Sequence, residues 1–230
     1  MNLPPIIALD GPASSGKTTV AHAIAAQYGY WLVDTGAFYR AVALAALRAG
    51  VPPSDSETLI ALAEQLQIEI LPADGTDGLF YRLRLNGEDV TAALRSAEVE
   101  AIVSQVAAVR GVREVLNTTF RRLAASYPRV IMVGRDIGTV VLPEAPLKIY
   151  LDASPEVRAA RRKAQSGQHD VQAVQQALQQ RDSIDSQRQI APLRPAEDAH
   201  YIDTSALDPQ AVIAHVQGLI TAWSVRHTQA

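Results

Sequence analysis

The sequence predicts an α/β protein with a P-loop NTPase-type parallel sheet and helices on both faces of that sheet. Short apolar runs typical of buried strands alternate with segments of helical periodicity along most of the chain. The first run, residues 4–10 (PPIIALD), is followed by a glycine-rich turn and then by a helical pattern. From residue 66 to about residue 90, apolar and polar residues alternate instead, which predicts a small antiparallel β insertion.

The composition is typical of a globular protein and excludes several kinds of chemistry. The 230 residues suit one domain with embellishments or two small domains, and 48% of them are hydrophobic. There is no cysteine, so disulfides, thiolate zinc sites and thiol catalysis are excluded. The five histidines are scattered without metal-ligand spacing, which argues against a zinc or iron centre.

Charge and hydropathy bear on the expected partners. The net charge of −3 gives no indication of nucleic-acid or membrane-surface binding. No run approaches the ~18 apolar residues of a membrane-spanning helix. The N-terminal stretch MNLPPIIALDG also lacks the basic and apolar regions of a signal peptide. We therefore expect a soluble, cytoplasmic monomer that binds neither nucleic acid nor membranes.

The stretch GPASSGKTT, residues 11–19, matches the P-loop motif G-x-x-x-x-G-K-[ST] between a strand and a helix. Its glycines allow positive φ and close backbone approach, so successive N–H groups can surround a phosphate. Lys17 is expected to reach the β- and γ-phosphates, and Thr18 is expected to hold Mg²⁺. The loop residues predicted to bind ATP are Gly11, Pro12, Ala13, Ser14, Ser15, Gly16, Lys17, Thr18 and Thr19.

A P-loop alone is compatible with GTPases, motor ATPases, small-molecule kinases and nucleotide kinases. GTPases usually read guanine with an Asn-Lys-x-Asp turn, but none of the three lysines here follows an asparagine. No D-x-x-G follows an apolar strand either. Both observations argue against a GTP-dependent switch.

A second helix is predicted after the apolar strand that ends at Val33. Asp34 or Thr35 can cap this helix, and Tyr39 and Arg40 lie one turn into it. A cap followed by a surface arginine is the simpler interpretation. The alternative is that Thr35 and Arg40 meet a second ligand near the transferred phosphate.

The next elements follow from changes of period along the chain. Within the insertion, Asn86-Gly87 is a strong signal for a two-residue hairpin, and one face of the sheet is expected to be polar. Helical patterns are predicted for SAEVEAIVSQVAAV and GVREVLNTTFRRLAASY, and strands for RVIMV and LKIYLD.

The segment VGRDIGTVV, residues 133–141, places Arg135 beside Asp136 at the end of a buried-type strand. Such charges are costly unless they are paired with each other or meet a ligand. Ligands of parallel sheets gather at the carboxyl ends of the strands. Because the P-loop, the DTG segment and the GRD segment each follow an apolar strand, we expect one rim to carry Lys17, Thr35, Arg40, Arg135 and Asp136.

In the segment VQAVQQALQQRDSIDSQR, apolar residues on one helix face are followed by charged residues on roughly the same face. Val171, Val174 and Leu178 have helical spacing, and Arg181, Asp185 and Arg188 continue roughly the same face. A solvated Arg–Asp–Arg ladder would contribute only a few tenths of a kcal/mol per pair. Charges on an inward face are better explained by an anionic ligand, provided that the helix does not break near Asp182.

The sequence resembles the bacterial cytidylate kinases over nearly the whole chain. The resemblance rests on five motifs in the same order: the P-loop, DTGAFYRA, VSQVAAVRGVRE, GRDIGTVV and QRDSIDSQR. That family transfers the γ-phosphate of ATP to CMP or dCMP in pyrimidine nucleotide metabolism, giving ADP and CDP or dCDP. The family also has an extra small sheet that matches the 66–90 insertion. It commonly has Asp-Gly-Arg-Asp where Val133 precedes Gly134 here, which puts a weak Mg²⁺-water contact in doubt.

The resemblance implies roles for the matching residues. Those expected to bind CMP are Thr35, Tyr39, Arg40, Ser104, Arg113, Arg135, Asp136, Arg181, Asp185 and Arg188. Among them, Arg40, Arg135 and Arg188 would hold the phosphate, Ser104, Arg113 and Asp136 would face cytosine, and Arg181 and Asp185 would face the sugar. Arg158 and Arg162 would close over the phosphates, with Arg158 on the ATP side. The residues implied in catalysis are Lys17, Arg135, Arg162 and Arg188.

The same resemblance implies a single kinase domain over residues 1–230. Its core would comprise residues 1–65, 105–155 and 182–230, its NMP-binding insertion residues 66–104, and its helical lid residues 156–181. ATP with Mg²⁺ and the acceptor nucleotide would be its small-molecule partners. Two alternatives remain open: a P-loop kinase for another nucleoside monophosphate or a small hydroxylated metabolite, and a nucleotide-gated regulator without turnover.

Overall fold

The chain folds into two compact units in a computed structural model that describes residues 2–73, 79–166 and 171–228. Unit 1 comprises Met1–Leu32 and Tyr127–Ala230, and unit 2 comprises Val33–Ser126. Unit 2 is therefore inserted in the sequence of unit 1.

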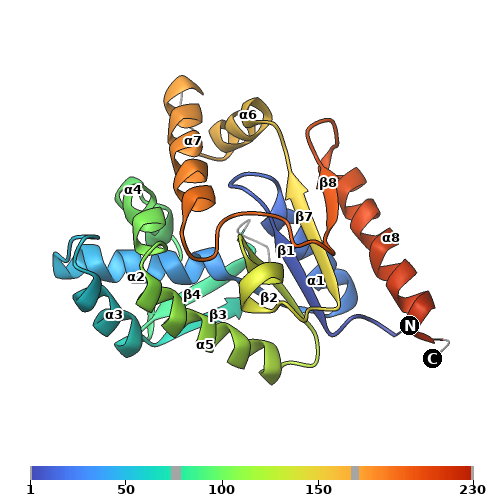
Figure 1. Ribbon diagram of the computed structural model, residues 1–230, viewed down its shortest axis with the longest axis horizontal. Helices are drawn as coiled ribbons and strands as arrows, with labels where there is room; N and C mark the ends of the chain where they lie inside the picture. The colour runs from blue at the N-terminus through green and yellow to red at the C-terminus, as the bar shows by residue number, and fades with distance from the viewer. Residues whose placement is uncertain (1, 74–78, 167–170, 229–230) are drawn as a thin grey trace. The chain divides into compact units, whose positions relative to one another are not determined.

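Unit 1 is built on a parallel sheet. Its strands are β1 (Ile6–Asp10), β6 (Val130–Gly134), β7 (Leu147–Asp152) and β8 (His200–Asp203), together with β2 (Trp31–Asp34), which begins in this unit. Its helices are α1 (Lys17–Tyr28), α6 (Pro155–Ser166), α7 (Val171–Gln187) and α8 (Pro209–Thr228). The strand order is β2-β6-β1-β7-β8, with β1 parallel to both of its neighbours. Figure 1 shows β1, β7 and β8 next to one another.

The strand register brings two chain segments together at the carboxyl edge of the sheet. Asp10, the last residue of β1, is the register partner of Gly134 in β6 and of Tyr150 in β7. The P-loop follows β1 and the Arg135–Asp136 pair follows β6. Because β1 and β6 are adjacent and parallel, these two segments leave the sheet side by side.

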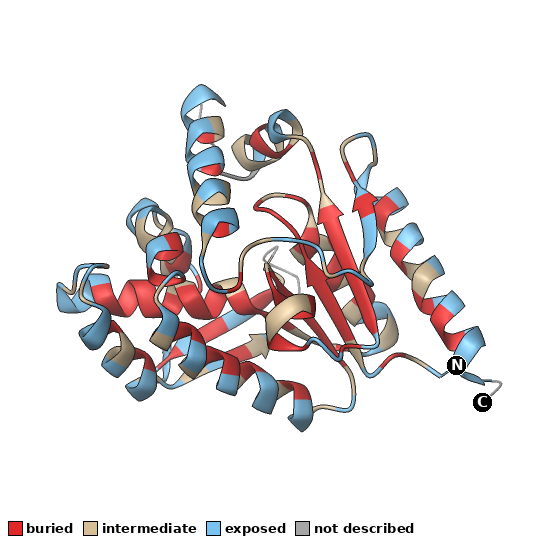
Figure 2. Cartoon of the chain, in the orientation of Figure 1, coloured by how far each residue is buried: buried red, intermediate tan, exposed pale blue. Residues whose placement is uncertain are grey.

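The main core of unit 1 joins the sheet to α1 and α8. Ile7 and Leu9 of β1 are fully buried, and so are Ile24 of α1 and Ile220 of α8, which belong to the same hydrophobic cluster (Figure 2). Complete burial of one such side chain stabilises the fold by roughly 1.5–3 kcal/mol. The core therefore supports the strand ends from which the candidate site is built.

Unit 2 combines four helices with the small antiparallel sheet. The helices are α2 (Thr35–Ala49), α3 (Ser56–Gln65), α4 (Ala97–Val106) and α5 (Arg110–Ser126), with a 3₁₀ turn η1 (Ala93–Arg95). The strands are β3 (Ile68–Pro72), β4 (Tyr81–Leu85) and β5 (Glu88–Asp89). Helix α2 packs against α3 and α4, and it is buried over most of its length (Figure 2).

The predicted hairpin lies between β4 and β5. Asn86 and Gly87 have φ of 51° and 84°, as a tight two-residue hairpin turn requires. Along β4, Tyr81, Leu83 and Leu85 are buried whereas the intervening arginines are exposed. The predicted α/β class, the antiparallel insertion and its one polar face are therefore confirmed.

The turn after β6 is among the elements of unit 1 that were not predicted, as are β8 and α8. Residues Ile137–Val141 form a single π-helical turn, η2, directly after Asp136. Val141 N donates to Asp136 O at 3.1 Å, and Leu142 N donates to Ile137 O at 2.7 Å. Such turns are rare and frequently occur at functional sites.

Two predicted segments fall partly outside the described residues. The predicted lid, residues 156–181, spans α6 and the first part of α7, but residues 167–170 are not described. The predicted insertion, residues 66–104, contains residues 74–78, which are not described either. Helices α6 and α7 pack against each other (Figure 1).

Candidate nucleotide-binding site

The P-loop has the backbone conformation of a phosphate-binding turn. Gly11, Ser14 and Gly16 have φ of 145°, 61° and 95°, respectively, and α1 begins immediately afterwards. A Cβ atom at position 11 would lie 2.0 Å from the carbonyl oxygen of Leu151, so only glycine fits there. The loop therefore presents backbone N–H groups at a helix N-terminus, where an anion is favoured by both the free donors and the helix dipole.

Lys17 supplies the positive charge of this loop. The side chain is buried, and Nζ donates to Pro12 O and to Ser15 Oγ, the latter at 3.3 Å. Both acceptors belong to residues 11–19. The ammonium group is thus held by acceptors of the loop itself.

Arg158 of α6 lies against the same loop. Its Nε donates to Ala153 O at 2.9 Å, and its Nη1 donates to Ala13 O at 3.4 Å and pairs with Asp182 of α7. One guanidinium thus joins the P-loop, the end of β7 and the two helices of the predicted lid segment. Arg162, one turn further along α6, is partly buried.

Sequence reasoning missed two residues near the P-loop. Arg161 donates from Nη1 to Thr204 Oγ1 at 2.9 Å and from Nη2 to Thr204 O at 2.7 Å. Thr204 Oγ1 also lies 3.4 Å from Ser15 O of the P-loop. The only sequence signal was the cluster of arginines in RAARR, which did not distinguish Arg161 from its neighbours.

In unit 1, Arg135 and Arg188 form a charge cluster around the buried carboxylate of Asp185. Arg135 Nε donates to Asp185 Oδ2 at 3.2 Å, and Arg188 Nη2 pairs with Asp185 Oδ1. Burial alone would raise the pKa of Asp185, but Arg135, Arg188 and Arg181 outweigh it and hold the pKa below its usual value. The carboxylate is therefore ionised and fixes two guanidinium groups.

The predicted inward face of α7 is confirmed at Val174, Leu178 and Asp185, whereas Arg181 is only partly buried and Arg188 lies directly after the helix. The helix runs without a break to Gln187, and Val174, Leu178 and Asp185 are all buried along it. A solvated ladder is therefore the wrong description of these charges.

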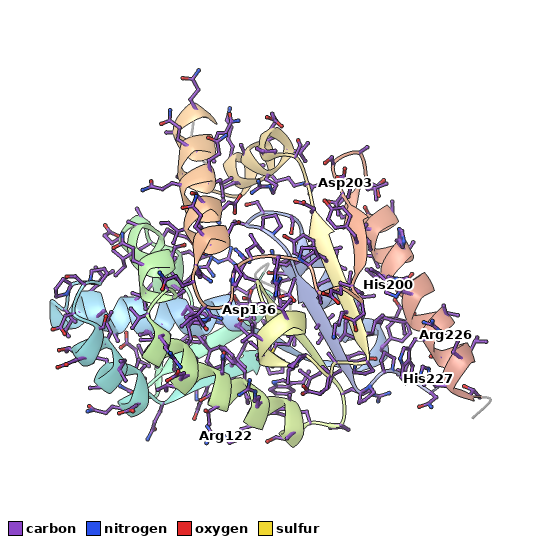
Figure 3. All side chains as sticks on the ribbon, viewed as in Figure 1. Arg122, Asp136, His200, Asp203, Arg226 and His227 are labelled. Carbon is purple, nitrogen blue, oxygen red and sulfur yellow. The ribbon has the colours of Figure 1, made fainter. Side chains whose placement is uncertain are left out.

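Asp136 lies at the entrance to η2 and is 4% exposed (Figure 3). The adjacent Arg135 donates to Asp185 of α7. Asp10, another residue that sequence reasoning missed, accepts from Ile137 N and Gly138 N at 2.8 Å each. Burial raises the pKa of Asp10 to about 6, although the two backbone donors oppose this shift.

In unit 2, the start of α2 is fixed by Asp34. Its Oδ1 accepts from Gly36 N at 3.0 Å, and its Oδ2 accepts from the hydroxyl of Tyr81 at 3.2 Å. Of the two predicted N-cap residues, Asp34 is therefore the one that caps α2. Thr35 is buried in the first turn.

Arg40 forms an ion pair with Glu100 of α4, with Nε 3.1 Å from Oε1. Burial lowers the pKa of Arg40, but Glu100, Tyr81 and Asp34 outweigh it and raise the pKa above its usual value. Arg40 also lines a small pocket in unit 2 with Tyr81, Thr91 and Arg95. The interpretation as a plain surface arginine is therefore wrong.

Arg113 and Tyr39 form a second buried group in unit 2. The Arg113 guanidinium lies 5.4 Å from the centre of the Tyr39 ring, and its Nη1 donates to Ala107 O at 3.2 Å. Arg113 is only 2% exposed, and Ser104 of α4 is also buried. A cation held against an aromatic face inside a fold is positioned with little rotamer freedom.

The predicted residues are divided between the two units. Unit 1 contains the P-loop, Arg135, Asp136, Arg158, Arg162, Arg181, Asp185 and Arg188. Unit 2 contains Thr35, Tyr39, Arg40, Ser104 and Arg113.

The described residues offer no group of three or more His, Cys, Asp or Glu side chains that could hold a metal ion. His200 and His227, for example, lie on β8 and at the end of α8 (Figure 3). Magnesium needs no such cage, because it usually keeps several waters and takes one or two protein oxygens plus nucleotide phosphates. The Thr18 hydroxyl in the first turn of α1 fits that donor set.

No helix in the described part of the chain is long and apolar enough to cross a membrane. This finding agrees with the hydropathy pattern of the sequence.

The parallel sheet, the P-loop after β1 and the arginine–carboxylate cluster after β6 define a P-loop kinase. Comparisons with known proteins identify the family. The cytidylate kinase family model matches residues 7–222. A cytidylate kinase of Roseiflexus castenholzii is 44% identical over 221 residues, which cover 94% of this chain and 93% of that protein.

A cytidylate kinase of Pseudomonas aeruginosa is 43% identical over 213 residues, covering 91% and 92% of the two chains. Among solved structures, an uncharacterized protein from Eubacterium ventriosum has a similar fold, with a TM-score of 0.51 at 11% identity over 95% and 99% of the chains. The chain belongs to the cytidylate kinase family, as its motifs predicted. Membership of this family implies that it uses ATP and nucleotide substrates.

Proposed function

We propose that the chain transfers the γ-phosphate of ATP to the phosphate of CMP or dCMP, forming ADP and CDP or dCDP. The bond between the γ-phosphorus and its bridging oxygen breaks, and a new bond forms from an acceptor phosphate oxygen. The observation that carries this proposal is the register of β1 and β6. It sets a triphosphate-binding loop beside a segment with both an arginine and a buried carboxylate.

On the donor side, the P-loop binds the ATP phosphates through its backbone N–H groups. Lys17 already lies over this loop and exchanges its contacts with Pro12 and Ser15 for the β- and γ-phosphate oxygens. Arg158 supports the loop through Ala13 O and lies on the ATP side of the lid. Arg162 closes over the phosphates from α6 as a second cation.

Thr18 is the residue that holds Mg²⁺ in this proposal. When bound, the ion supplies neutralising charge to the phosphate oxygens. Valine has no side-chain oxygen, and the Val133 side chain is buried in the core cluster with Leu9 and Ile131, so it contributes no ligand to the ion. Thr18 and the nucleotide therefore hold the ion without help from position 133.

On the acceptor side, Arg135 and Arg188 bind the CMP phosphate. Asp185 fixes both guanidinium groups from one carboxylate, which prepares them to meet an anion without a further loss of rotamer freedom. We also assign Arg40 to this phosphate, and Thr35 and Tyr39 to the acceptor; all three belong to α2.

The base and the sugar are read by different residues. Asp136 accepts from the exocyclic amino group of cytosine, and it repels the carbonyl that uracil has at the same position. Ser104 and Arg113 of unit 2 also face the base. Arg181 and Asp185 of α7 face the sugar.

No general base is required by this chemistry. Phosphoryl transfer passes through a loose transition state, so positioning and positive charge perform most of the catalysis. Lys17, Arg135, Arg162 and Arg188 supply that charge from the donor and acceptor sides. Closure of the lid, residues 156–181, over the site excludes water that would hydrolyse ATP. We place this activity in cytoplasmic pyrimidine metabolism and assign it to a monomer that does not bind nucleic acid.

An ADP-release assay across CMP, dCMP, UMP, AMP and shikimate tests the proposal. We expect turnover with CMP and dCMP well above turnover with the other acceptors. Equal or faster rates with UMP, AMP or shikimate would contradict it, and ATP binding without transfer to any of them would favour a regulator.

A further inference from the structure

Asp10 is a buried carboxylate to which the reaction assigns no role. It ends β1 and directly precedes Gly11, the first residue of the P-loop. Only 5% of it is exposed. An ionised group at such a depth is costly unless specific partners compensate for the lost hydration.

The hydrogen-bond donors to Asp10 come from the segment after β6, which contains Asp136, the residue proposed to recognise cytosine. Its two carboxylate oxygens each accept one backbone hydrogen bond, Oδ1 from Ile137 N and Oδ2 from Gly138 N, both at 2.8 Å. These residues are 127 and 128 positions away in the sequence. They begin η2, and the residue before them is Asp136.

The contact is closely fitted. A Cβ atom at position 138 would lie 3.1 Å from Lys148 Cδ and 3.5 Å from Asp10 Oδ2, so glycine lets the backbone approach the carboxylate. Lys148 is itself fixed by Asp198, with Nζ 2.9 Å from Oδ2. The charged neighbours of Asp10 are Asp136, which repels it, and Lys17, which attracts it.

We infer that Asp10 is a positioning residue that fixes Asp136 and Arg135 relative to the P-loop. The inference rests on the proposed function of those two residues. Asp10 acts through rigid backbone. Its main chain continues into Gly11, which lies against Leu151 O. Its side chain accepts hydrogen bonds from the first two N–H groups of η2. Donor loop and base-reading carboxylate thus share one anchor.

A capping role without functional consequence is the competing explanation. A carboxylate at the start of a helical turn satisfies N–H groups that would otherwise be orphaned, and this stabilises many folds. The two explanations differ in which substrate is affected. A cap that only stabilises the fold leaves KM for both nucleotides unchanged in the protein that remains folded, whereas an anchor of Asp136 selectively affects CMP.

The substitution Asp10→Asn separates these explanations. Asparagine has nearly the same shape, but its single oxygen can accept from only one of the two N–H groups, and its amide donors oppose the other. We expect KM for CMP to rise about tenfold or more and the CMP-over-UMP preference to fall, with KM for ATP within about threefold. Equal losses for ATP and CMP, or an unchanged KM for CMP, would overturn the inference.

Asp152→Asn is the matched control. Asp152 also ends a strand of the same sheet, where it accepts from Ala153 N at 2.8 Å and from the Tyr201 hydroxyl at 2.7 Å. Asn at this position should leave KM for both nucleotides within about twofold. A tenfold rise in KM for CMP in this control would mean that any change at this edge of the sheet has the same effect, which would also overturn the inference.

Hydrogen exchange of the wild-type protein provides a test that does not depend on the variant or on activity. The amides of Ile137 and Gly138 should be strongly protected without nucleotide, because a buried carboxylate holds both. Exchange as fast as that of exposed loops would overturn the inference. If the wild-type protein does not phosphorylate CMP while these amides are protected, the proposed function fails and the anchor itself stands.

Discussion

Arg135 donates through Nε to Asp185 Oδ2 at 3.2 Å, although the two residues are 50 positions apart in the sequence. Asp185 also pairs with Arg188, so one buried carboxylate organises two guanidinium groups. These pairs join the C-terminal end of α7 to the segment that follows β6 in unit 1.

Replacing Asp185 by Ala should impair both stability and acceptor binding. Removing one partner of a buried ion pair leaves uncompensated charge and costs about 3 kcal/mol. We expect KM for CMP to rise about tenfold or more, because Arg135 and Arg188 lose their common anchor. Urea unfolding and steady-state kinetics measure the two effects. An unchanged KM for CMP would show that Asp185 acts only on stability.

The pH dependence of stability should carry a contribution from Asp185. Its pKa is held below the usual value in the folded protein by Arg135, Arg188 and Arg181, against the effect of burial. A lowered folded pKa gives stability that is fully present above the unfolded pKa of about 3.9 and is lost as the pH falls through the folded pKa. The gap in unfolding free energy between wild type and Asp185→Asn should therefore shrink below about pH 4.

Urea unfolding at a series of pH values measures that gap. Glu64→Gln, which changes an exposed carboxylate on α3, is the control and should give a much smaller gap. A wild-type advantage over Asp185→Asn that grows as the pH falls to 3 would contradict this prediction.

Replacing Lys17 by Ala should lower kcat by roughly 10²–10³-fold, because a preorganised charge at the transferred phosphate is lost. The fold should persist, since Pro12 O and Ser15 Oγ are neutral acceptors, and water can replace Lys17 as their hydrogen-bond donor. Circular dichroism checks the fold and the ADP-release assay checks the rate. Arg226→Ala, which removes an exposed cation from α8, is the control and should retain full activity (Figure 3). Retained activity in Lys17→Ala would refute the assignment of the donor site.

Replacing Asp136 should change the choice of base. Asp136→Ala should raise KM for CMP by about 10–100-fold, the effect of losing a hydrogen bond to a charged group, with little change in KM for ATP. Asp136→Asn should also improve the relative rate with UMP, because an amide can donate to the uracil carbonyl. Steady-state kinetics with CMP, UMP and ATP measure these changes in KM and relative rate. Parallel losses for ATP and CMP would mean that the role of Asp136 is structural.

Much of the fold could be predicted because its signals are local. The P-loop, the Asn86-Gly87 hairpin and the helix that starts at Asp34 depend on backbone conformations that nearby residues allow or forbid. The spacing of Val174, Leu178 and Asp185 likewise follows from helix geometry alone. For these features the sequence by itself determined the outcome, and the structure agrees.

Tertiary structure decided which charges meet. Nothing local indicates that Asp10 holds η2, that Arg135 turns to Asp185, or that Arg161 reaches Thr204. Each of these contacts depends on the order and register of parallel strands and on helices packed across them, which bring together residues far apart in the chain. Sequence motifs therefore identified the family and its candidate residues, whereas the strand register and helix packing determined which side chains hold one another in place.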